Sequence, residues 1–127
     1  VLDEFNNFME EEIYQMMVAT TEDQDELILE NTTTLKVARW WNRACDIIPC
    51  NGGKDIGIQK ILDYFNFNKE EAMAFGDGGN DISMLKYVGT GVAMGNAKDN
   101  VKAIADYITD SVQEDGIVSA LKHFEIL

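Results

Sequence analysis

The sequence predicts an α/β protein that contains a parallel sheet with covering helices, preceded by a smaller α+β unit. Three observations lead to this fold class: alternating helical and buried-strand patterns after residue 53, a strand pair with a tight turn before residue 49, and a change of composition between them. Residues 49–53, Pro-Cys-Asn-Gly-Gly, mark that change and include the only proline of the chain. We therefore expect a domain boundary there, with one unit over 1–49 and another over 50–127.

The first unit is expected to combine helices with an antiparallel strand pair. Thr21 and Gln24, three positions apart, resemble a capping box and predict the start of a helix, while Asn42 and Arg43 form the turn of a β-hairpin. The expected elements, in order, are a helix, a strand, a helix and two strands, over residues 2–11, 13–19, 21–31, 32–41 and 44–49. This order indicates a small, open α+β unit.

The second unit alternates between helical and buried-strand patterns. Ile58, Ile61, Leu62 and Phe65 follow helical spacing and place one apolar face on the helix expected over 54–67. Strands are expected over 72–75, 91–94 and 107–108, with helices after Asn80, after Asn96 and through Ile117, Leu121 and Phe124. This alternation is typical of a parallel sheet, in which ligands bind at the carboxyl ends of the strands.

The composition is that of an acidic globular chain of 127 residues. Hydrophobic residues make up 46% of it, too many for a disordered tail, yet no apolar run approaches the roughly 20 residues that span a bilayer. The 23 acidic and 10 basic residues give a net charge of −13. This charge argues against a nucleic-acid partner and against binding to an anionic membrane surface.

Cysteine and histidine are too sparse to indicate a zinc site. Cys45 and Cys50 have no further cysteine to pair with, and the only histidine, His123, is far away in the sequence. We expect reduced thiols in a cytoplasmic protein, because no signal-peptide pattern opens the chain. The chain begins at Val1 and residues 2–12 resemble the middle of an element, which predicts a fragment or a processed piece.

The chemically informative stretch is residues 75–81, Phe-Gly-Asp-Gly-Gly-Asn-Asp, at the end of an expected buried strand. Glycines allow a tight turn close to a ligand, and carboxylate oxygens are the donors that a hard divalent cation requires. Asp77 and Asp81 could therefore face one cation from two sides of the same loop. The alternative is structural, because Asp and Asn near glycine commonly serve as turn residues and helix N-caps.

The surrounding pattern resembles the C-terminal signature of the Cof-type phosphatases in the haloacid dehalogenase-like (HAD) superfamily. The matching segments are Phe-Gly-Asp-Gly-Gly-Asn-Asp at 75–81, Gly-Val-Ala-Met-Gly-Asn-Ala at 91–97, Ala-Asp-Tyr-Ile-Thr-Asp at 105–110 and Glu-Asp-Gly-Ile at 114–117. The resemblance covers about residues 49–125. It implies that 50–127 form the C-terminal half of a Rossmann-like core and that 1–49 form the C-terminal part of a C2-type α/β cap.

The same resemblance implies a Mg²⁺-dependent phosphatase that acts on small phosphorylated metabolites such as sugar phosphates. In this family Asp77 would ligate Mg²⁺, Asp81 would support the metal site, and Asn80 would contact the phosphoryl group. Lys54, at the start of the helix after the cap, would be the catalytic lysine that binds phosphate. A cation at a helix N-terminus is disfavoured by the helix dipole unless an anion lies nearby, which favours this role over a solvated surface lysine.

The nucleophilic half of such a site is not found among the 127 residues. The family requires an apolar strand ending in Asp-x-Asp-Gly-Thr, whose first aspartate attacks phosphorus. Asp23 and Asp25 form a literal D-x-D, but no Gly-Thr follows and a capped helix is expected to start there, so we interpret them as a solvated helical turn. We therefore expect the isolated chain to be inactive.

A second class of function remains open, namely a non-catalytic module that binds Mg²⁺ or a partner. A sheet without its neighbouring strands exposes an edge and apolar faces, which favours a homodimer or strand exchange. Arg39 and Arg43 on the hairpin are conceivable substrate contacts, although such arginines are more often solvated. Trp40 and Trp41 fit either function as core or cap-interface residues.

Overall fold

The computed structural model describes residues 12–127, so the helix expected over 2–11 lies outside the described residues. Contacts divide the chain into two compact units, Val1–Cys50 and Asn51–Leu127. Each unit has its own three-stranded sheet, antiparallel in the first and parallel in the second. The α/β fold class predicted from the sequence is therefore confirmed.

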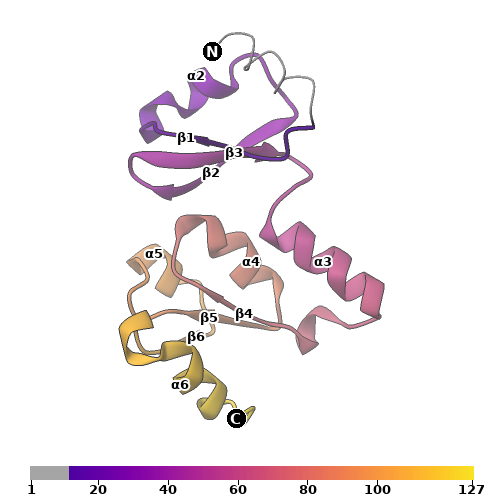
Figure 1. Ribbon diagram of the computed structural model, residues 1–127, viewed down its shortest axis with the longest axis vertical. Coiled ribbons are helices and arrows are strands. Elements are labelled where there is room, and N and C mark those ends of the chain that lie inside the picture. The colour runs from indigo at the N-terminus through magenta and orange to yellow at the C-terminus, as the bar shows by residue number, and fades with distance from the viewer. Residues whose placement is uncertain (1–11) are drawn as a thin grey trace. The chain divides into compact units, whose positions relative to one another are not determined.

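Within the described residues, the first unit is an antiparallel sheet of strand order β1-β3-β2 with one short α-helix (Figure 1). Its elements are β1 Met16–Val18, a 3-10 turn Glu22–Gln24, α2 Asp25–Leu29, β2 Leu35–Trp41 and β3 Ala44–Pro49. Ala44, Cys45 and Ile47 on the central strand are buried. The register between β2 and β3 shifts between Arg39 and Trp41, which marks a β-bulge near the turn.

The predicted capping box at Thr21 is wrong, because its side chain makes no capping hydrogen bond. Instead Thr20, which is buried, donates from Oγ1 to Gln24 Oε1 at 2.6 Å. The segment starts as a 3-10 turn, and the α-helix is correspondingly short, ending at Leu29 rather than at residue 31. Gln24 therefore bonds to Thr20 and not to Thr21, the predicted partner.

The second unit is a parallel sheet of strand order β4-β5-β6, with α3 and α4 on one side and α6 on the other (Figure 1). Its elements are α3 Lys54–Phe65, β4 Met73–Gly76, α4 Ile82–Tyr87, β5 Thr90–Ala93, α5 Asp99–Lys102, β6 Tyr107–Ile108 and α6 Gly116–His123. Short 3-10 turns occupy Lys69–Glu71, Gly79–Asp81 and Val112–Glu114. Parallel strands need such helical crossover connections, which place successive strands side by side with helices over the sheet.

The core of the second unit lies between the sheet and the helices α4 and α5. Its buried members are small or branched apolar side chains: Ala74, Leu85, Val88, Ala93, Ala97 and Val101. Gly91 lets β5 pass close under α4, because a Cβ at this position would collide with the backbone carbonyl of Leu85. The core therefore holds β4 and β5 in fixed register, with their carboxyl ends at the same edge of the sheet.

The helix α3 is only partly covered within the described residues. Ile58 packs against the core and Leu62 is half-buried, but Ile61 and Phe65 are each 60% exposed. The predicted helix is present, but within the described residues its apolar face is only partly buried. The helix ends at Phe65 because Asn66 adopts a left-handed conformation with φ of 57°, a common way to terminate a helix.

Candidate active site

The acidic loop begins where β4 ends and is organised around a buried carboxylate. Asp81 is only 5% exposed, and its Oδ2 accepts hydrogen bonds from the backbone N–H groups of Asp77 and Gly78, each at 3.0 Å. Both bonds close the loop over the side chain. Asp81 therefore holds the loop in shape, which is the reason its burial is tolerated.

Gly76 makes room for this buried carboxylate. A Cβ at Gly76 would lie 2.6 Å from Asp81 Cβ and 3.0 Å from Asp81 Cγ, which is closer than carbon atoms can approach. The last residue of β4 is thus a glycine because the Asp81 side chain packs directly on its Cα. Gly76 is therefore required for packing, whereas its backbone has the extended conformation of a strand.

Lys54 reaches the loop from the first residue of α3, 27 positions away in the sequence, and forms an ion pair with Asp81 Oδ1. Burial alone would raise the pKa of the Asp81 carboxyl. The Lys54 ammonium and the N–H groups of Gly78 and Asp77 outweigh that effect and hold the pKa below its ordinary value. Because the Lys54 side chain is 51% exposed and an ammonium has three donors, it can also meet an anion from solvent.

Asp77 lies at the mouth of the loop, where its side chain is exposed. Its Oδ2 accepts a hydrogen bond from Asn96 Nδ2 at 3.1 Å, and Asn96 Oδ1 accepts one from the backbone N–H of Val112 at 2.9 Å. No hydrogen bond to Asp77 Oδ1 is found within residues 12–127. That oxygen is therefore the one that a cation from solvent would meet first.

Asn96 is a site residue that the sequence reasoning did not single out. The available signal was its position, since it follows β5 at the edge where β4 also ends. Carboxyl ends of neighbouring parallel strands lie side by side, so polar residues after both strands are brought together.

Asn80 lies half-buried in the 3-10 turn Gly79–Asp81 that follows the acidic residue. The prediction that it caps the next helix is wrong, because α4 begins at Ile82 and the residue in the cap position is Asp81. The structure nevertheless keeps Asn80 within the same loop as Asp77 and Asp81. The four residues predicted for the site, Lys54, Asp77, Asn80 and Asp81, therefore lie at one edge of the parallel sheet.

The two arginines of the hairpin have different surroundings. Arg39 forms an ion pair with Asp25, donates from Nη1 to the carbonyl of Thr20 at 2.8 Å, and has only 17% of its side chain exposed. It ties β2 to α2, so it serves the fold of the first unit. Asp25 is accordingly a partner in this ion pair rather than the solvated residue that the sequence predicts, whereas Arg43 is exposed in the turn.

The donor set fits one side of a magnesium site. Among residues 12–127, no group of three or more His, Cys, Asp or Glu side chains could hold a metal ion by itself. Mg²⁺ is usually bound through one or two carboxylates, with water and substrate phosphate completing its octahedral shell. Asp77 offers such a carboxylate, while the oxygens of Asp81 are already engaged by Lys54 and the loop backbone.

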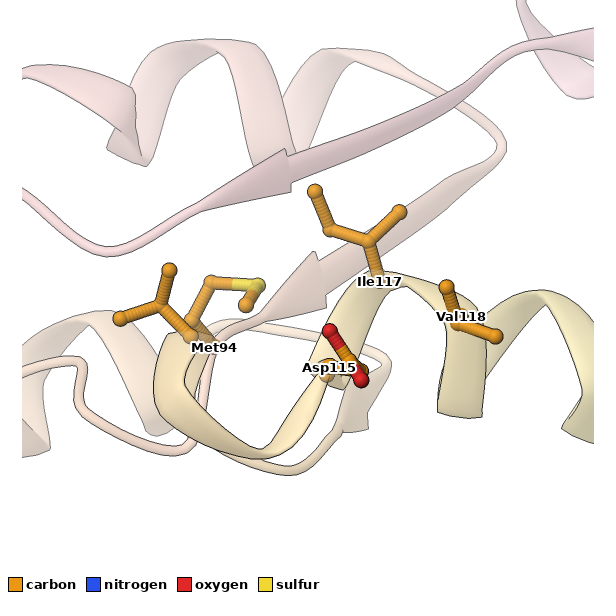
Figure 2. A pocket seen from close by; sticks show the side chains of 6 residues that line it. Met94, Asp115, Ile117 and Val118 are labelled. Atoms are coloured by element: carbon orange, nitrogen blue, oxygen red, sulfur yellow. The ribbon is translucent and has the colours of Figure 1, made fainter.

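A separate open hollow of about 260 Å³ lies beside the helix α6. It is lined by Met94, Val112, Asp115, Gly116, Ile117 and Val118, and Figure 2 shows the Met94 side chain on the side opposite Ile117 and Val118. Its lining is mostly apolar and its only charged residue is an acid. Such a lining is unsuited to a phosphate, so the acidic loop remains the candidate site.

The chain resembles known phosphatases along its length. A family described as haloacid dehalogenase-like hydrolase matches residues 1–121. The 5-amino-6-(5-phospho-D-ribitylamino)uracil phosphatase YitU of Bacillus subtilis (strain 168) is 44% identical over 89 residues, which cover 68% of this chain and 33% of YitU.

Two solved structures share its fold. The HAD subclass IIB sugar phosphatase BT4131 matches with a TM-score of 0.88 and 43% identity, over 97% of this chain and 47% of that protein. BT1666 from Bacteroides thetaiotaomicron, a phosphatase of the same superfamily, matches with a TM-score of 0.90 and 37% identity, over 100% and 47%. This chain thus spans about half the length of either structure. The family match over residues 1–121 and the similarity to these structures show that the chain belongs to the haloacid dehalogenase-like hydrolases.

Proposed function

We propose that this chain forms one half of a Mg²⁺-dependent phosphatase for small phosphorylated metabolites such as sugar phosphates. The observation that carries the proposal is the meeting of Lys54, Asp77 and Asp81 at the carboxyl edge of the parallel sheet. Lys54 supplies a cation for the phosphate and Asp77 an exposed carboxylate for the metal ion, and both residues are linked to the same buried Asp81. The sugar phosphatase BT4131 shares the fold at 43% identity, which supports this substrate class.

Each residue has a distinct task under this proposal. Asp77 holds Mg²⁺ through its exposed carboxylate, and the bound ion would screen the charge repulsion between the phosphate and its nucleophile. Lys54 donates to the phosphoryl oxygens with the donors that Asp81 leaves unused. Asp81 fixes both the loop and the lysine, and Asn80 lies beside the phosphoryl group as an amide donor. The N-terminal end of α3, where Lys54 begins the helix, adds a favourable dipole for an anion.

The nucleophile would come from outside these 127 residues. They contain no Asp-x-Asp-Gly-Thr, and the chain spans 47% of BT4131 and 47% of BT1666. We therefore propose that the chain is a C-terminal fragment of the enzyme, with 1–49 as part of the cap and 50–127 as part of the core. Alone it would bind ligands without turnover. We also propose a cytoplasmic location, since both cysteines of the described residues are free. No described helix is long and apolar enough to cross a membrane.

The alternative function is a non-catalytic module that associates with a second copy of itself. Among the described strands, β4 pairs with β5 alone, so its other edge has unpaired backbone groups. Apolar side chains are exposed on α3, including Ile61, Tyr64 and Phe65. Both features favour a homodimer or strand exchange, which size-exclusion chromatography with light scattering would detect as twice the mass of 14.3 kDa.

The test of the phosphatase proposal is hydrolysis of p-nitrophenyl phosphate with and without Mg²⁺. The chain alone is expected to be inactive, and the chain joined to the N-terminal half of a similar phosphatase is expected to be active. In the joined protein, Asp77→Asn and Lys54→Ala should each lower kcat at least a hundredfold, whereas Asp63→Asn on the exposed face of α3 should not. An active joined protein that tolerates Asp77→Asn would contradict the site assignment.

A further inference from the structure

The side chain of Asn96 joins two segments that are distant in the sequence. Its Nδ2 donates to Asp77 Oδ2 at 3.1 Å, 19 positions away, and its Oδ1 accepts from the backbone N–H of Val112 at 2.9 Å. We propose that Asn96 is a positioning residue that fixes the Asp77 carboxylate in the orientation required to receive Mg²⁺. The metal-binding part of this inference rests on the proposed function, whereas the positioning part concerns the chain itself.

The two hydrogen bonds together define the orientation of the amide. A carboxylate can only accept, so the group facing Asp77 must be the NH₂; a backbone N–H can only donate, so the group facing Val112 must be the carbonyl oxygen. An Asp at this position would keep the bond to Val112 and would place a second negative charge beside Asp77. An Ala would lose both bonds. The bridge therefore requires an amide of this length.

The backbone around Asn96 is held firmly enough to give the amide a defined position. On one side Met94 N–H donates to the carbonyl of Gly76 at 2.9 Å, which ties the segment to the end of β4. On the other side Gly95 N–H donates to the carbonyl of Asp110 at 3.0 Å, and a Cβ at Gly95 would lie 2.6 Å from the backbone nitrogen of Ser111. Asn96 thus stands between two backbone segments in close contact.

The partner on the far side of the bridge is also fixed. Val112 opens the 3-10 turn Val112–Glu114, which begins with a capping box between Ser111 and Glu114. In addition, Ser111 Oγ donates to Glu114 Oε2 at 2.7 Å. The turn leads into α6, where the buried Thr109 donates from Oγ1 to the carbonyl of Gly116 at 2.6 Å. The N–H of Val112 is therefore a fixed donor. It positions the Asn96 amide, which in turn positions the Asp77 carboxylate.

Because the two side chains of the Asn96–Asp77 hydrogen bond are exposed, this bond can contribute to the orientation of Asp77 more than to folding stability. Asn96 and Asp77 are both exposed, so water can replace a lost hydrogen bond at little cost to folding. Water cannot, however, restore the orientation that Asn96 gives to the Asp77 carboxylate. With Oδ2 engaged, the side chain keeps one rotamer, and Oδ1 is presented to a cation without the entropy cost of ordering it on binding. The expected signature is a change in side-chain order and metal affinity with little change in stability.

The experiment is nuclear magnetic resonance on the 127-residue chain. Three-bond couplings from Asp77 Cγ to its backbone nitrogen and carbonyl carbon report the χ1 rotamer without any metal, and titration with Mg²⁺ follows the amides of Asp77 and Gly78. The variants are Asn96→Ala and Asn96→Asp. The matched control is Asn100→Ala, the same substitution at an exposed position of α5.

The proposal expects the wild type and Asn100→Ala to show one dominant Asp77 rotamer and Asn96→Ala to show averaged couplings. Asn96→Asp should leave the Val112 amide resonance in place yet change the Asp77 couplings, which a role confined to the Val112 turn would not produce. The Mg²⁺ dissociation constant should rise about tenfold in Asn96→Ala, at the lower end of what orienting residues contribute to metal sites.

Two results would overturn the positioning role: averaged Asp77 couplings in the wild type, or wild-type couplings retained in Asn96→Ala. A different result bears on the proposed function alone. If Mg²⁺ leaves the Asp77 and Gly78 amides of the wild type unchanged, the chain does not bind the metal as proposed, while the couplings still decide whether Asn96 orients Asp77.

Discussion

Replacing Asp81 by alanine should destabilise the second unit because the side chain organises the loop from inside. The substitution removes the acceptor for two backbone N–H groups and the partner of Lys54. Hydrogen bonds to a charged acceptor contribute about 1.5–3 kcal/mol when buried, and we take about 1 kcal/mol for each backbone bond because water can reach this loop. The lysine is half-exposed, so its ion pair adds at most about 1 kcal/mol. The free energy of unfolding should fall by about 2–3 kcal/mol.

The choice of assay follows from the positions of the tryptophans. Trp40 and Trp41 both lie in the first unit, so their fluorescence does not report unfolding of the second. Hydrogen exchange at the amide of the fully buried Val92 reports the second unit directly, and far-UV circular dichroism on heating follows the secondary structure of both units. A loss of this size lowers the melting temperature on the order of 10 °C for a unit of this length.

The matched controls separate the loop from general effects of removing an acid. Asp63→Ala removes an exposed carboxylate from α3 and should change the free energy of unfolding by less than about 0.5 kcal/mol. Asp81→Asn keeps an acceptor for the loop N–H groups but loses the charge, so its effect should lie between the other two. If Asp81→Ala proves no more destabilising than Asp63→Ala, the loop does not depend on this carboxylate and the reasoning is wrong.

Three further predictions follow from the same contacts. Gly76→Ala should cost about 1–3 kcal/mol in thermal unfolding, because its Cβ would collide with Asp81, and faster exchange of the Gly78 amide would show that the loop has opened. Because the pKa of Asp81 is lower in the folded than in the unfolded chain, its stabilisation is present above about pH 4 and lost as pH falls further; urea titrations should show a steeper loss for wild type than for Asp81→Asn. Arg39→Ala should lower the urea midpoint seen by tryptophan fluorescence and leave Val92 exchange unchanged, and an equal effect of Arg43→Ala would contradict the structural role of Arg39.

Local sequence was sufficient for the order and type of most elements. The strand over 44–49 and the short strand over 107–108 lie where they were predicted, because each is an apolar run bounded by turn residues. The helix expected after Asn96 was indicated by the apolar residues Val101, Ile104 and Ala105, but it spans only Asp99–Lys102. Ile104 and Ala105 pack against the core from outside it, so their apolar spacing reflects burial rather than helical structure.

The site was predictable as a set of residues but not as an arrangement. The acidic loop and Lys54 could be identified because glycines, carboxylates and a lysine at a helix start form an informative pattern. That Asp81 lies buried beneath the loop, with its oxygens committed to Lys54 and two N–H groups, depends on contacts that span 27 and 4 positions. Asn96 was missed because its relation to Asp77 exists only once β4 and β5 pair.

Among the described strands one edge of β4 has no partner, and this edge should also affect how the molecule behaves in concentrated solution. Unpaired strand groups and exposed apolar side chains attract a second molecule over short distances, whereas the net charge of −13 repels it over longer ones. Salt shortens the range of that repulsion to about 10 Å at 0.1 M and leaves the short-range attraction intact. Self-association should therefore increase with ionic strength, and variants can be compared only at a fixed salt concentration.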